Sequence, residues 1–405
     1  MPKNIVVSDL FAGIPSSVRL TAPLELSPPL SEPELLSEFR RLAELNDSPS
    51  FLGGGSYERF IPTAVKHLIG RAEFYTAYTP YQAEASQGTL QAIYEYQSLV
   101  CALTVMEVAN ASLYDGATAL AEAAFMAVRL TGRKEVVVSG AVNPFYRDVL
   151  RTYCRAADLT LREIPYEPST GRTGAVDRLG NSACFIIQQP NFFGSLETVA
   201  GLAEKIHAAG ALFIVSADPL TLGLLKGPGE YGADIVVAEG QGLGNPRYFG
   251  GPGLGIFATK KSFVRQMPGR VVGATTDLDG KRGFVLTLST REQHIRRERA
   301  TSNICSNEAL CALAAAIHLS LLGKNGLKKA AGLALQKAAY LKRSIPPWRL
   351  LFPDTPVFNE LAIKTDRPIG LSLSPHYPEL GEARLVSVSE LTSLDELGKL
   401  ISELS

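Results

Sequence analysis

The sequence has no excess of charge of either sign and no long apolar run. In 405 residues, 40 lysines and arginines balance 40 aspartates and glutamates. A chain without net charge has no strong field for nucleic acid or for an anionic membrane surface. No run approaches the roughly 18 apolar residues of a membrane-spanning helix, and the first ten residues lack the apolar core of a signal peptide. We therefore expect a cytoplasmic protein that binds a small molecule or another protein, and neither nucleic acid nor a membrane.

Cysteines and histidines are few and are not arranged as ligands. The five cysteines stand singly, with no C-x-x-C pair, and the five histidines show no metal-ligand spacing. This pattern predicts reduced thiols and no metal site. A catalytic cysteine stays open as an alternative, although nothing beside the cysteines is typical of an activating base.

Apolar runs alternate with helical patterns through the middle of the chain. Strands that are apolar over their whole length and are separated by helices are typical of a mostly parallel sheet with helices on both faces. We therefore predict an α/β fold. The main apolar runs are 135–140, 183–191, 211–219, 234–240 and 253–259, and the helical patterns between and before them are 87–110, 116–133, 143–158 and 194–210.

Three regions are expected along the chain. Residues 1–60 form an N-terminal arm and helix, in which SEPE (31–34) is a capping box and the proline-rich part before it wraps over a neighbour. Residues 61–322 form the large α/β domain. Residues 323–405 form a smaller α+β domain, with short strands expected at WRLLFP, FNELAIK and ARLVSVSE and a last helix that begins near Ser393.

Three polar features follow predicted strands or begin predicted helices, where open α/β sheets bind ligands. The residues Asp115, Gly116, Ala117 and Thr118 open a helix whose first amides can hold an anion, although an ordinary N-cap formed by Asp115 is the simpler interpretation. Asp218 ends an apolar strand, where a carboxylate can bond a pyridinium nitrogen or serve as a turn residue. The third feature is the glycine-rich loop 239–253.

The order of these features is that of fold-type I pyridoxal-phosphate enzymes, in which such a strand and loop often carry the lysine that holds the cofactor. No lysine occurs from Gly227 to Thr259. The chain resembles the P-protein family of the glycine cleavage system (glycine decarboxylase), in the form of its alpha, or first, subunit. The resemblance is carried by residues 74–97, 109–127, 186–194, 224–258 and 291–315.

The resemblance implies an α₂β₂ oxidoreductase that decarboxylates glycine and passes the aminomethyl group to the lipoyl arm of the H-protein. The beta subunit carries pyridoxal phosphate on a lysine, and this chain has Gln241 and Gly242 at about the matching positions. It implies that Asp115 to Thr118, Asp218 and Gln241 form a remnant cofactor pocket, kept for its shape. A self-sufficient pyridoxal-phosphate enzyme and a purely structural or regulatory subunit remain the alternatives.

Two segments are candidates for lining the partner's site across the interface. Five of the 14 tyrosines fall between residues 75 and 96. We predict that Tyr75, Tyr78, Tyr81 and Gln87 approach the beta subunit's cofactor or its glycine; an ordinary interface loop is the alternative. The glycines Gly53, Gly54 and Gly55 permit close backbone approach and are predicted to line the shared cleft, or else to form a plain flexible turn.

Overall fold

The computed structural model describes residues 11–20, 22–46 and 50–404, and the chain divides into two compact units, Met1–Pro49 and Ser50–Ser405. The first unit contains helix α1 (Glu32–Glu44). Its predicted capping box is confirmed, since the Glu34 carboxylate accepts a hydrogen bond from the Ser31 backbone N–H at 2.8 Å. None of the described residues of α1 is buried. That the proline-rich part before this helix wraps over a neighbour stays a prediction.

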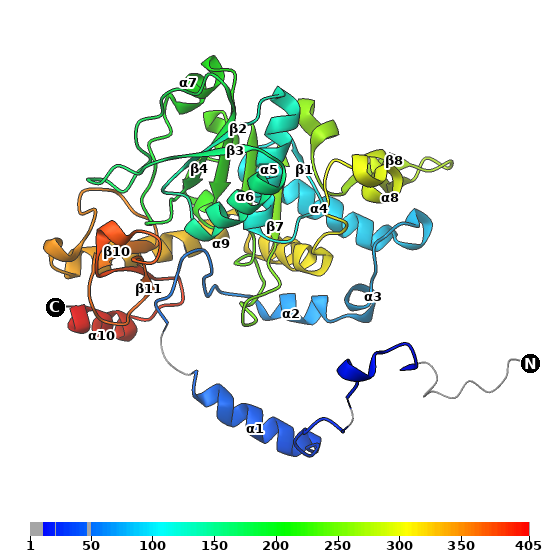
Figure 1. Cartoon of the computed structure of the whole chain (residues 1–405), viewed down its shortest axis with the longest axis horizontal. Coiled ribbons are helices and arrows are strands. Elements are labelled where there is room, and N and C mark those ends of the chain that lie inside the picture. The colour runs from blue at the N-terminus through cyan, green and yellow to red at the C-terminus, as the bar shows by residue number, and fades with distance from the viewer. Residues whose placement is uncertain (1–10, 21, 47–49, 405) are drawn as a thin grey trace, which may run out of the picture. The chain divides into compact units, whose positions relative to one another are not determined.

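The second unit is built around a seven-stranded sheet with the strand order β1-β7-β6-β5-β4-β2-β3 (Figure 1). Strands β3, β2, β4, β5 and β6 pair in parallel, while β7 is antiparallel to both of its neighbours. The predicted mostly parallel sheet is therefore confirmed. Its strands are β1 (Val108–Ala109), β2 (Glu135–Ser139), β3 (Thr160–Ile164), β4 (Ser182–Gln189), β5 (Leu212–Ala217), β6 (Ile235–Glu239) and β7 (Gly255–Thr259).

Helices cover both faces of this sheet. Alternate strand residues such as Val136 and Ile186 pack with α5 and α6, whereas their neighbours Val137 and Ile187 pack with α4, α7 and α9. Apolar side chains therefore leave every central strand on both sides, as a parallel sheet requires. The helices of this unit are α2 (Thr63–Ile69), α3 (Ala72–Tyr75), α4 (Gln87–Thr104), α5 (Gly116–Thr131), α6 (Pro144–Ala156), α7 (Leu202–Ala208), α8 (Gln293–Arg296), α9 (Ala309–Ser344) and α10 (Leu394–Leu404).

Helix α7 is shorter than the helix expected over 194–210. Ser195 forms a bridge with Val357, and the Leu196 N–H donates to the Pro356 carbonyl at 2.9 Å, so the first residues of the expected helix are held in extended form. The helix starts only after Gly201, whose positive φ of 73° turns the chain. Contacts with a distant segment therefore outweigh the local helical pattern.

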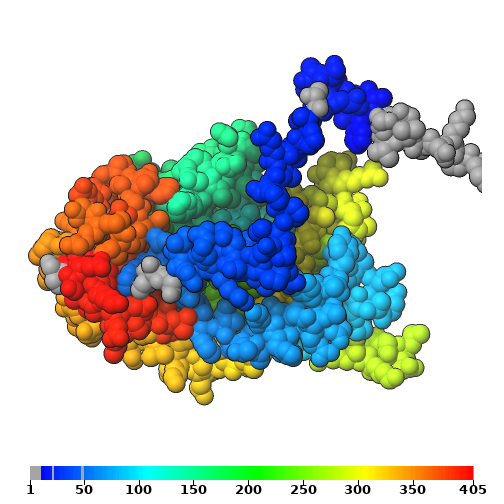
Figure 2. Space-filling model, turned by 90° about the horizontal axis from the view of Figure 1, so that it is seen from below, coloured from blue at the N-terminus to red at the C-terminus, as the bar shows by residue number. Residues whose placement is uncertain are grey.

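The end of the chain forms a three-stranded sheet of the order β10-β12-β11, where β10 is Glu360–Lys364, β11 is Leu371–Ser372 and β12 is Ala383–Ser387. The prediction of a strand at WRLLFP is wrong. Pro347–Arg349 forms a 3₁₀ turn, and only Leu350 forms a β-bridge, to Ile363. The segment after Ser50 contacts this sheet through hydrogen bonds from Gly54 and Tyr57 to Glu360, and Figure 2 shows the orange and red C-terminal residues gathered at one end of the molecule.

The segment α9 consists of two helices joined by a kink at Gly323, where φ is 57° and ψ is −173°, and this kink lies at the expected domain boundary. It is long and apolar enough to cross a membrane by length and composition alone. Its first half nevertheless lies in the core, with Ala312, Ala315 and Leu319 buried. It is therefore the core helix of a folded domain. A hairpin of β8 (Val271–Thr276) and β9 (Arg282–Thr287), not foreseen in the sequence, precedes it.

A candidate ligand cavity at the edge of the sheet

A cavity that opens to solvent lies where β4, β5 and β6 end. Strands β5 and β6 pair in parallel up to Ala217 and Ala238, so the next residues, Asp218 and Glu239, reach the same edge side by side. Asp218, Glu239 and Gln241 line the cavity, together with the start of α6 and with Gly55, Tyr57 and Arg59. The sheet edge predicted to bind a ligand is therefore hollow.

The first turn of α5 is capped by the chain itself. The Asp115 carboxylate accepts a hydrogen bond from the Thr118 N–H at 2.8 Å, and the Thr118 hydroxyl bonds back to Asp115, so the N-cap interpretation is confirmed. The Gly116 N–H, which has no acceptor within the helix, donates to the Glu239 carboxylate at 2.9 Å. Gly116 allows this approach, because a Cβ there would lie 3.0 Å from the Glu239 backbone nitrogen.

Glu239 is a buried carboxylate of the cavity wall; the sequence named it only as the start of the loop 239–253 and predicted no role for its side chain. Its carboxylate accepts three backbone hydrogen bonds, from Gly116 at 2.9 Å, from Gln241 at 2.8 Å and from Leu254 at 2.9 Å. Burial raises the pKa of Glu239 to about 7, because loss of water outweighs the lowering effect of the three N–H groups. The signal was present in the sequence: a glutamate directly after four apolar strand residues points to the binding edge.

Asp218 serves both as a turn residue and as part of an ion pair. One carboxylate oxygen accepts the Leu220 N–H at 2.9 Å, which confirms its interpretation as a turn residue. The other lies 3.4 Å from the Arg59 guanidinium. Burial raises the pKa of Asp218, and Arg59 opposes that shift to a smaller extent. The group expected to meet a pyridinium nitrogen therefore already meets a cation of the chain.

Arg59 enters the cavity from the segment before α2. Its side chain is only 4% exposed, bonds Glu390 at 3.1 Å and lies over the ring of Tyr57 at 4.6 Å. A Cβ at Gly242 would lie 3.2 Å from Arg59 Cγ. Arg59 therefore occupies the space that a longer side chain at position 242 would need.

Gln241 is buried and its side-chain amide donates to the carbonyl of Asn245 in its own loop. Among the described residues that line the cavity, none is a lysine. Two hydroxyls on the wall, those of Tyr146 and Ser216, have no hydrogen-bond partner within the described part of the chain. Gln188 lies beside Ser216 on the paired strand β4.

The glycine segment 53–55 is fixed and does not form a plain flexible turn. The Gly54 N–H donates to the Glu360 carboxylate at 2.7 Å, and its carbonyl accepts from the Asn143 amide at 2.8 Å. A Cβ at Gly53 would lie 2.1 Å from the same carboxylate. Gly55 lines the chain's own cavity. An additional approach of these glycines to a partner's site stays a prediction.

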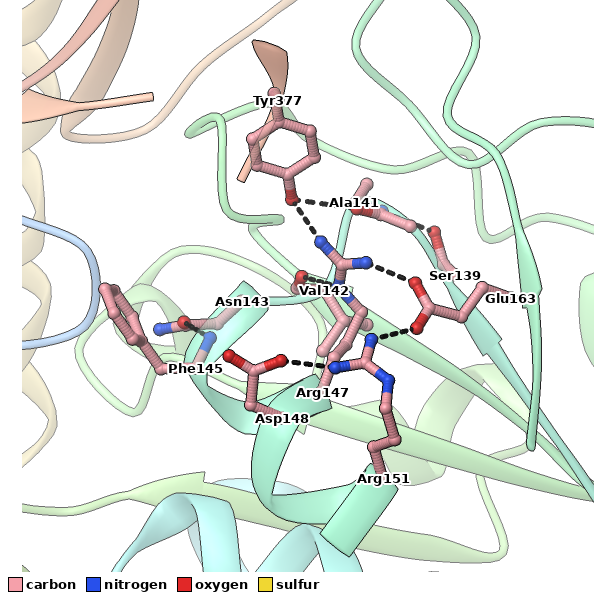
Figure 3. A network of polar contacts seen from close by, with 11 residues as sticks. Ser139, Ala141, Val142, Asn143, Phe145, Arg147, Asp148, Arg151, Glu163 and Tyr377 are labelled. Atoms are coloured by element: carbon pink, nitrogen blue, oxygen red, sulfur yellow. Dashed lines mark hydrogen bonds and ion pairs between the residues drawn. The ribbon is translucent and has the colours of Figure 1, made fainter. Parts of the chain in front are cut away.

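A network of polar contacts holds the α6 side of the cavity (Figure 3). The buried Arg147 side chain donates to Glu163 on β3, to the Tyr377 hydroxyl at 2.9 Å and to the Val142 carbonyl at 3.0 Å. Tyr377 in turn donates to the Gly140 carbonyl at 2.9 Å. This network joins the C-terminal segment to the start of α6, so it fixes the wall that carries Asn143.

The tyrosine loop does not line this cavity. Tyr75, Tyr78 and Tyr81 are exposed by 68%, 85% and 51%, and Tyr81 accepts a hydrogen bond from the buried Arg270 at 3.0 Å. A mostly apolar hollow is lined by Tyr75 and Tyr78 and by the start of α9. The Gln87 amide is bonded on both sides to the Phe284 backbone and holds the β9 strand. A contact of these four residues with a partner's ligand stays a prediction.

Comparison with solved structures defines the class of fold. The chain matches a sphingosine-1-phosphate lyase of Burkholderia pseudomallei K96243 with a TM-score of 0.64 and 16% identity, over 95% of this chain and 92% of that chain. It matches a glutamate decarboxylase of Lactobacillus brevis with a TM-score of 0.63 and 14% identity, over 96% of this chain and 95% of that one. The fold is that of the fold-type I pyridoxal-phosphate enzymes.

The family follows from more similar proteins. A model of the glycine cleavage system P-protein matches residues 5–370. A "probable glycine dehydrogenase (decarboxylating) subunit 1" of Desulforamulus reducens is 48% identical over 100% of this chain and 96% of its own length, and one of Desulfitobacterium hafniense is 51% identical over 98% and 94%. A crystal structure of glycine decarboxylase (P-protein) in inhibitor-bound form has a TM-score of 0.90 and 44% identity, over 99% of this chain and 94% of that chain. The chain belongs to the glycine cleavage system P-protein family.

The residues of this cavity do not suit pyridoxal phosphate. Its described wall offers no lysine for a Schiff base. The N–H at the start of α5 is taken by Glu239, and Asp218 is paired with Arg59. The groups predicted to meet the phosphate and the pyridinium nitrogen of the cofactor therefore already have partners in the chain.

Proposed function

We propose that this chain is the alpha subunit of a glycine dehydrogenase (decarboxylating) and that it works with a beta subunit in an α₂β₂ assembly in the cytoplasm. Pyridoxal phosphate, which takes up the electrons left when a carboxylate departs as CO₂, is bound by the beta subunit on this proposal. The aminomethyl group then passes to the lipoyl arm of the H-protein. One observation carries the proposal: the cavity lies at the sheet edge where fold-type I enzymes bind the cofactor, and its described wall contains no lysine.

The role of the chain in this assembly follows from its two surfaces. Its own cavity has the position of an active site, but its main charges are bonded to one another or to the backbone. The tyrosine loop, in contrast, presents exposed phenol side chains with a firm attachment at Tyr81. We infer that the chain contributes this loop to the partner's site, where Tyr75, Tyr78 or Tyr81 would contact glycine or the cofactor and keep water out.

The proposal is tested with the purified chain alone, the beta subunit alone and the mixture. Each sample receives pyridoxal phosphate, is reduced with borohydride and is mapped by mass spectrometry, while glycine-dependent exchange of CO₂ is measured in parallel. We expect label only on the beta subunit and exchange only in the mixture. Label on a lysine of this chain, together with exchange by the chain alone, would show a self-sufficient enzyme and overturn the proposal.

A further inference from the structure

We propose that Glu239 and Arg59 act as built-in substitutes for the charges of a cofactor and close the cavity to phosphate-bearing ligands. Glu239 takes the place of a phosphate at the start of α5, and Arg59 takes the place of a ring cation beside Asp218. This inference deepens the proposed function and rests on it. A subunit that leaves the cofactor to its partner must not capture the cofactor itself.

The Glu239 carboxylate has the surroundings of a bound anion. Three backbone N–H groups, of Gly116, Gln241 and Leu254, converge on it within 2.9 Å. One of them is the first N–H of a 16-residue helix, whose N-terminus favours negative charge. Converging backbone N–H groups at a helix start are the arrangement with which proteins hold phosphate. The anion is supplied here by the chain, 123 residues along the sequence from Gly116.

A phosphate could enter this place only by displacing that carboxylate. The displaced group would lose three hydrogen bonds, and the phosphate would then lie beside the Asp115 carboxylate that caps the same helix. The repulsion between Glu239 and Asp115 already contributes to the raised pKa of Glu239. A phosphate with up to two charges would be repelled more strongly.

Arg59 completes the arrangement on the other side of the cavity. Its guanidinium bridges Asp218 at 3.4 Å and Glu390 at 3.1 Å, and its stem lies against Gly242. It is the one cationic side chain among the described residues that line the cavity. Because it is committed to two carboxylates, no cation in that wall is left to hold a phosphate.

The test is a titration of the full-length chain with inorganic phosphate and with pyridoxal phosphate, followed by calorimetry. In Glu239→Ala the three N–H groups lose their anion and gain space. We expect this variant to bind both ligands at least about tenfold more tightly than the wild-type chain, which is about 1.4 kcal/mol. A wild-type chain that binds phosphate as tightly as the variant would overturn the inference.

Matched variants separate the roles of space and charge. Glu239→Gln keeps the size but places an NH₂ group against a backbone N–H, so it should stay closed to phosphate. Glu308→Gln removes a neighbouring carboxyl group that interacts with Asp115 only through its charge. The three N–H groups keep the Glu239 carboxylate in this variant, so its cavity should also stay closed to phosphate. Phosphate binding by Glu308→Gln equal to that of Glu239→Ala would show that only the general field matters and would contradict the inference.

A rescue experiment keeps the test decisive if Glu239→Ala is unstable. Formate carries the same carboxylate and should raise the melting temperature of Glu239→Ala, with no comparable shift for wild type. Glu239→Ser, whose hydroxyl can still satisfy one N–H, is the milder variant and should respond in the same direction. Folded variants that respond to neither formate nor phosphate would overturn the inference. That failure differs from a borohydride-labelled lysine in this chain, which would overturn the proposed function.

Discussion

The cavity and the tyrosine loop differ in whether their polar side chains have partners within the chain. At the cavity, the polar groups meet one another: Glu239 bonds three backbone N–H groups and Arg59 joins Asp218 to Glu390. In the loop, Tyr78 is 85% exposed and has no polar partner within the described part of the chain. A fold can therefore keep the position of an active site while it pairs the charged groups of that site internally. Groups left without partners are better guides to function than the inherited position.

The largest expected effect is at the attachment of the tyrosine loop. Arg270 is buried, donates to Tyr81 and pairs with Glu292 at 3.5 Å. Arg270→Met leaves a carboxylate without its cation, so we expect the free energy of unfolding to fall by about 3 to 5 kcal/mol. Urea denaturation measures this change.

Arg282→Met is the control for Arg270→Met, because Arg282 is exposed and lies over the rings of Tyr94 and Phe284. It should cost no more than about 1 kcal/mol. Equal losses for the two variants would show that Arg270 is not a special attachment of the loop.

The second effect tests the rigidity of the cavity side. In Gly53→Ala the new Cβ would lie 2.1 Å from Glu360, so the segment must shift and the free energy of unfolding should fall by about 1 to 3 kcal/mol. Gly88→Ala is the matched control, because no atom lies within 4 Å of its new Cβ in helix α4. It should raise the stability by up to about 1 kcal/mol. A harmless Gly53→Ala would mean that residues 53–55 are a flexible turn after all.

The third prediction is a loss of enzyme activity with almost no change in the stability of the chain. Tyr78→Ala removes a side chain that is largely in solvent, so the stability of the chain should change by less than about 0.5 kcal/mol. In the assembled enzyme we expect kcat for glycine-dependent CO₂ exchange to fall about tenfold, or about 1.4 kcal/mol. Tyr94→Phe, in a packed ring pair with Phe284, is the control that should leave exchange unchanged. Full activity of Tyr78→Ala would make the loop an ordinary interface element.

The last prediction is a pH dependence at Glu360. Burial raises its pKa from 4.5 to about 7, so the folded chain binds this proton more tightly than the unfolded chain. Its contribution to stability is therefore fully present below pH 4.5 and is lost as the pH rises to about 7. Glu360→Gln removes this titration and should reduce the change in unfolding free energy between pH 5 and pH 8, measured by urea denaturation, while the part that comes from Glu239, whose pKa is also raised to about 7, remains. Glu58→Gln, at an exposed position, should leave the wild-type slope, and an unchanged slope in Glu360→Gln would contradict the assignment.

The main sheet could be predicted from the sequence because its strands are apolar on both faces, which is a local pattern. The β8–β9 hairpin could not, since its sequence VVGATTDLDGKRGFVLT is largely polar at its far end and is held by Gln87, almost 200 residues away. The shortening of α7 also depends on a distant segment, at Pro356 and Val357. Local propensity predicts elements, and tertiary contacts decide their limits.

The site divides in the same way. Asp218 was found because it ends an apolar strand, and Gln241 because the family resemblance places it at about the position of the lysine motif; each does line the cavity. Their partners were not found, because Arg59 lies 159 residues from Asp218 and no local pattern connects them. Ser216 was missed because its position in an apolar strand hides a hydroxyl that faces the cavity. The lack of a lysine was visible in the sequence, but the charges that replace the cofactor were not.

The most direct test of the central claim is a structure of the complete complex with the beta subunit, pyridoxal phosphate and a glycine analogue. The account predicts cofactor only in the beta subunit, the Glu239 carboxylate on the α5 N-terminus of this chain, and at least one of Tyr75, Tyr78 and Tyr81 against the bound analogue. Cofactor bound in the cavity between Glu239 and Arg59, with the tyrosine loop far from any ligand, would contradict it.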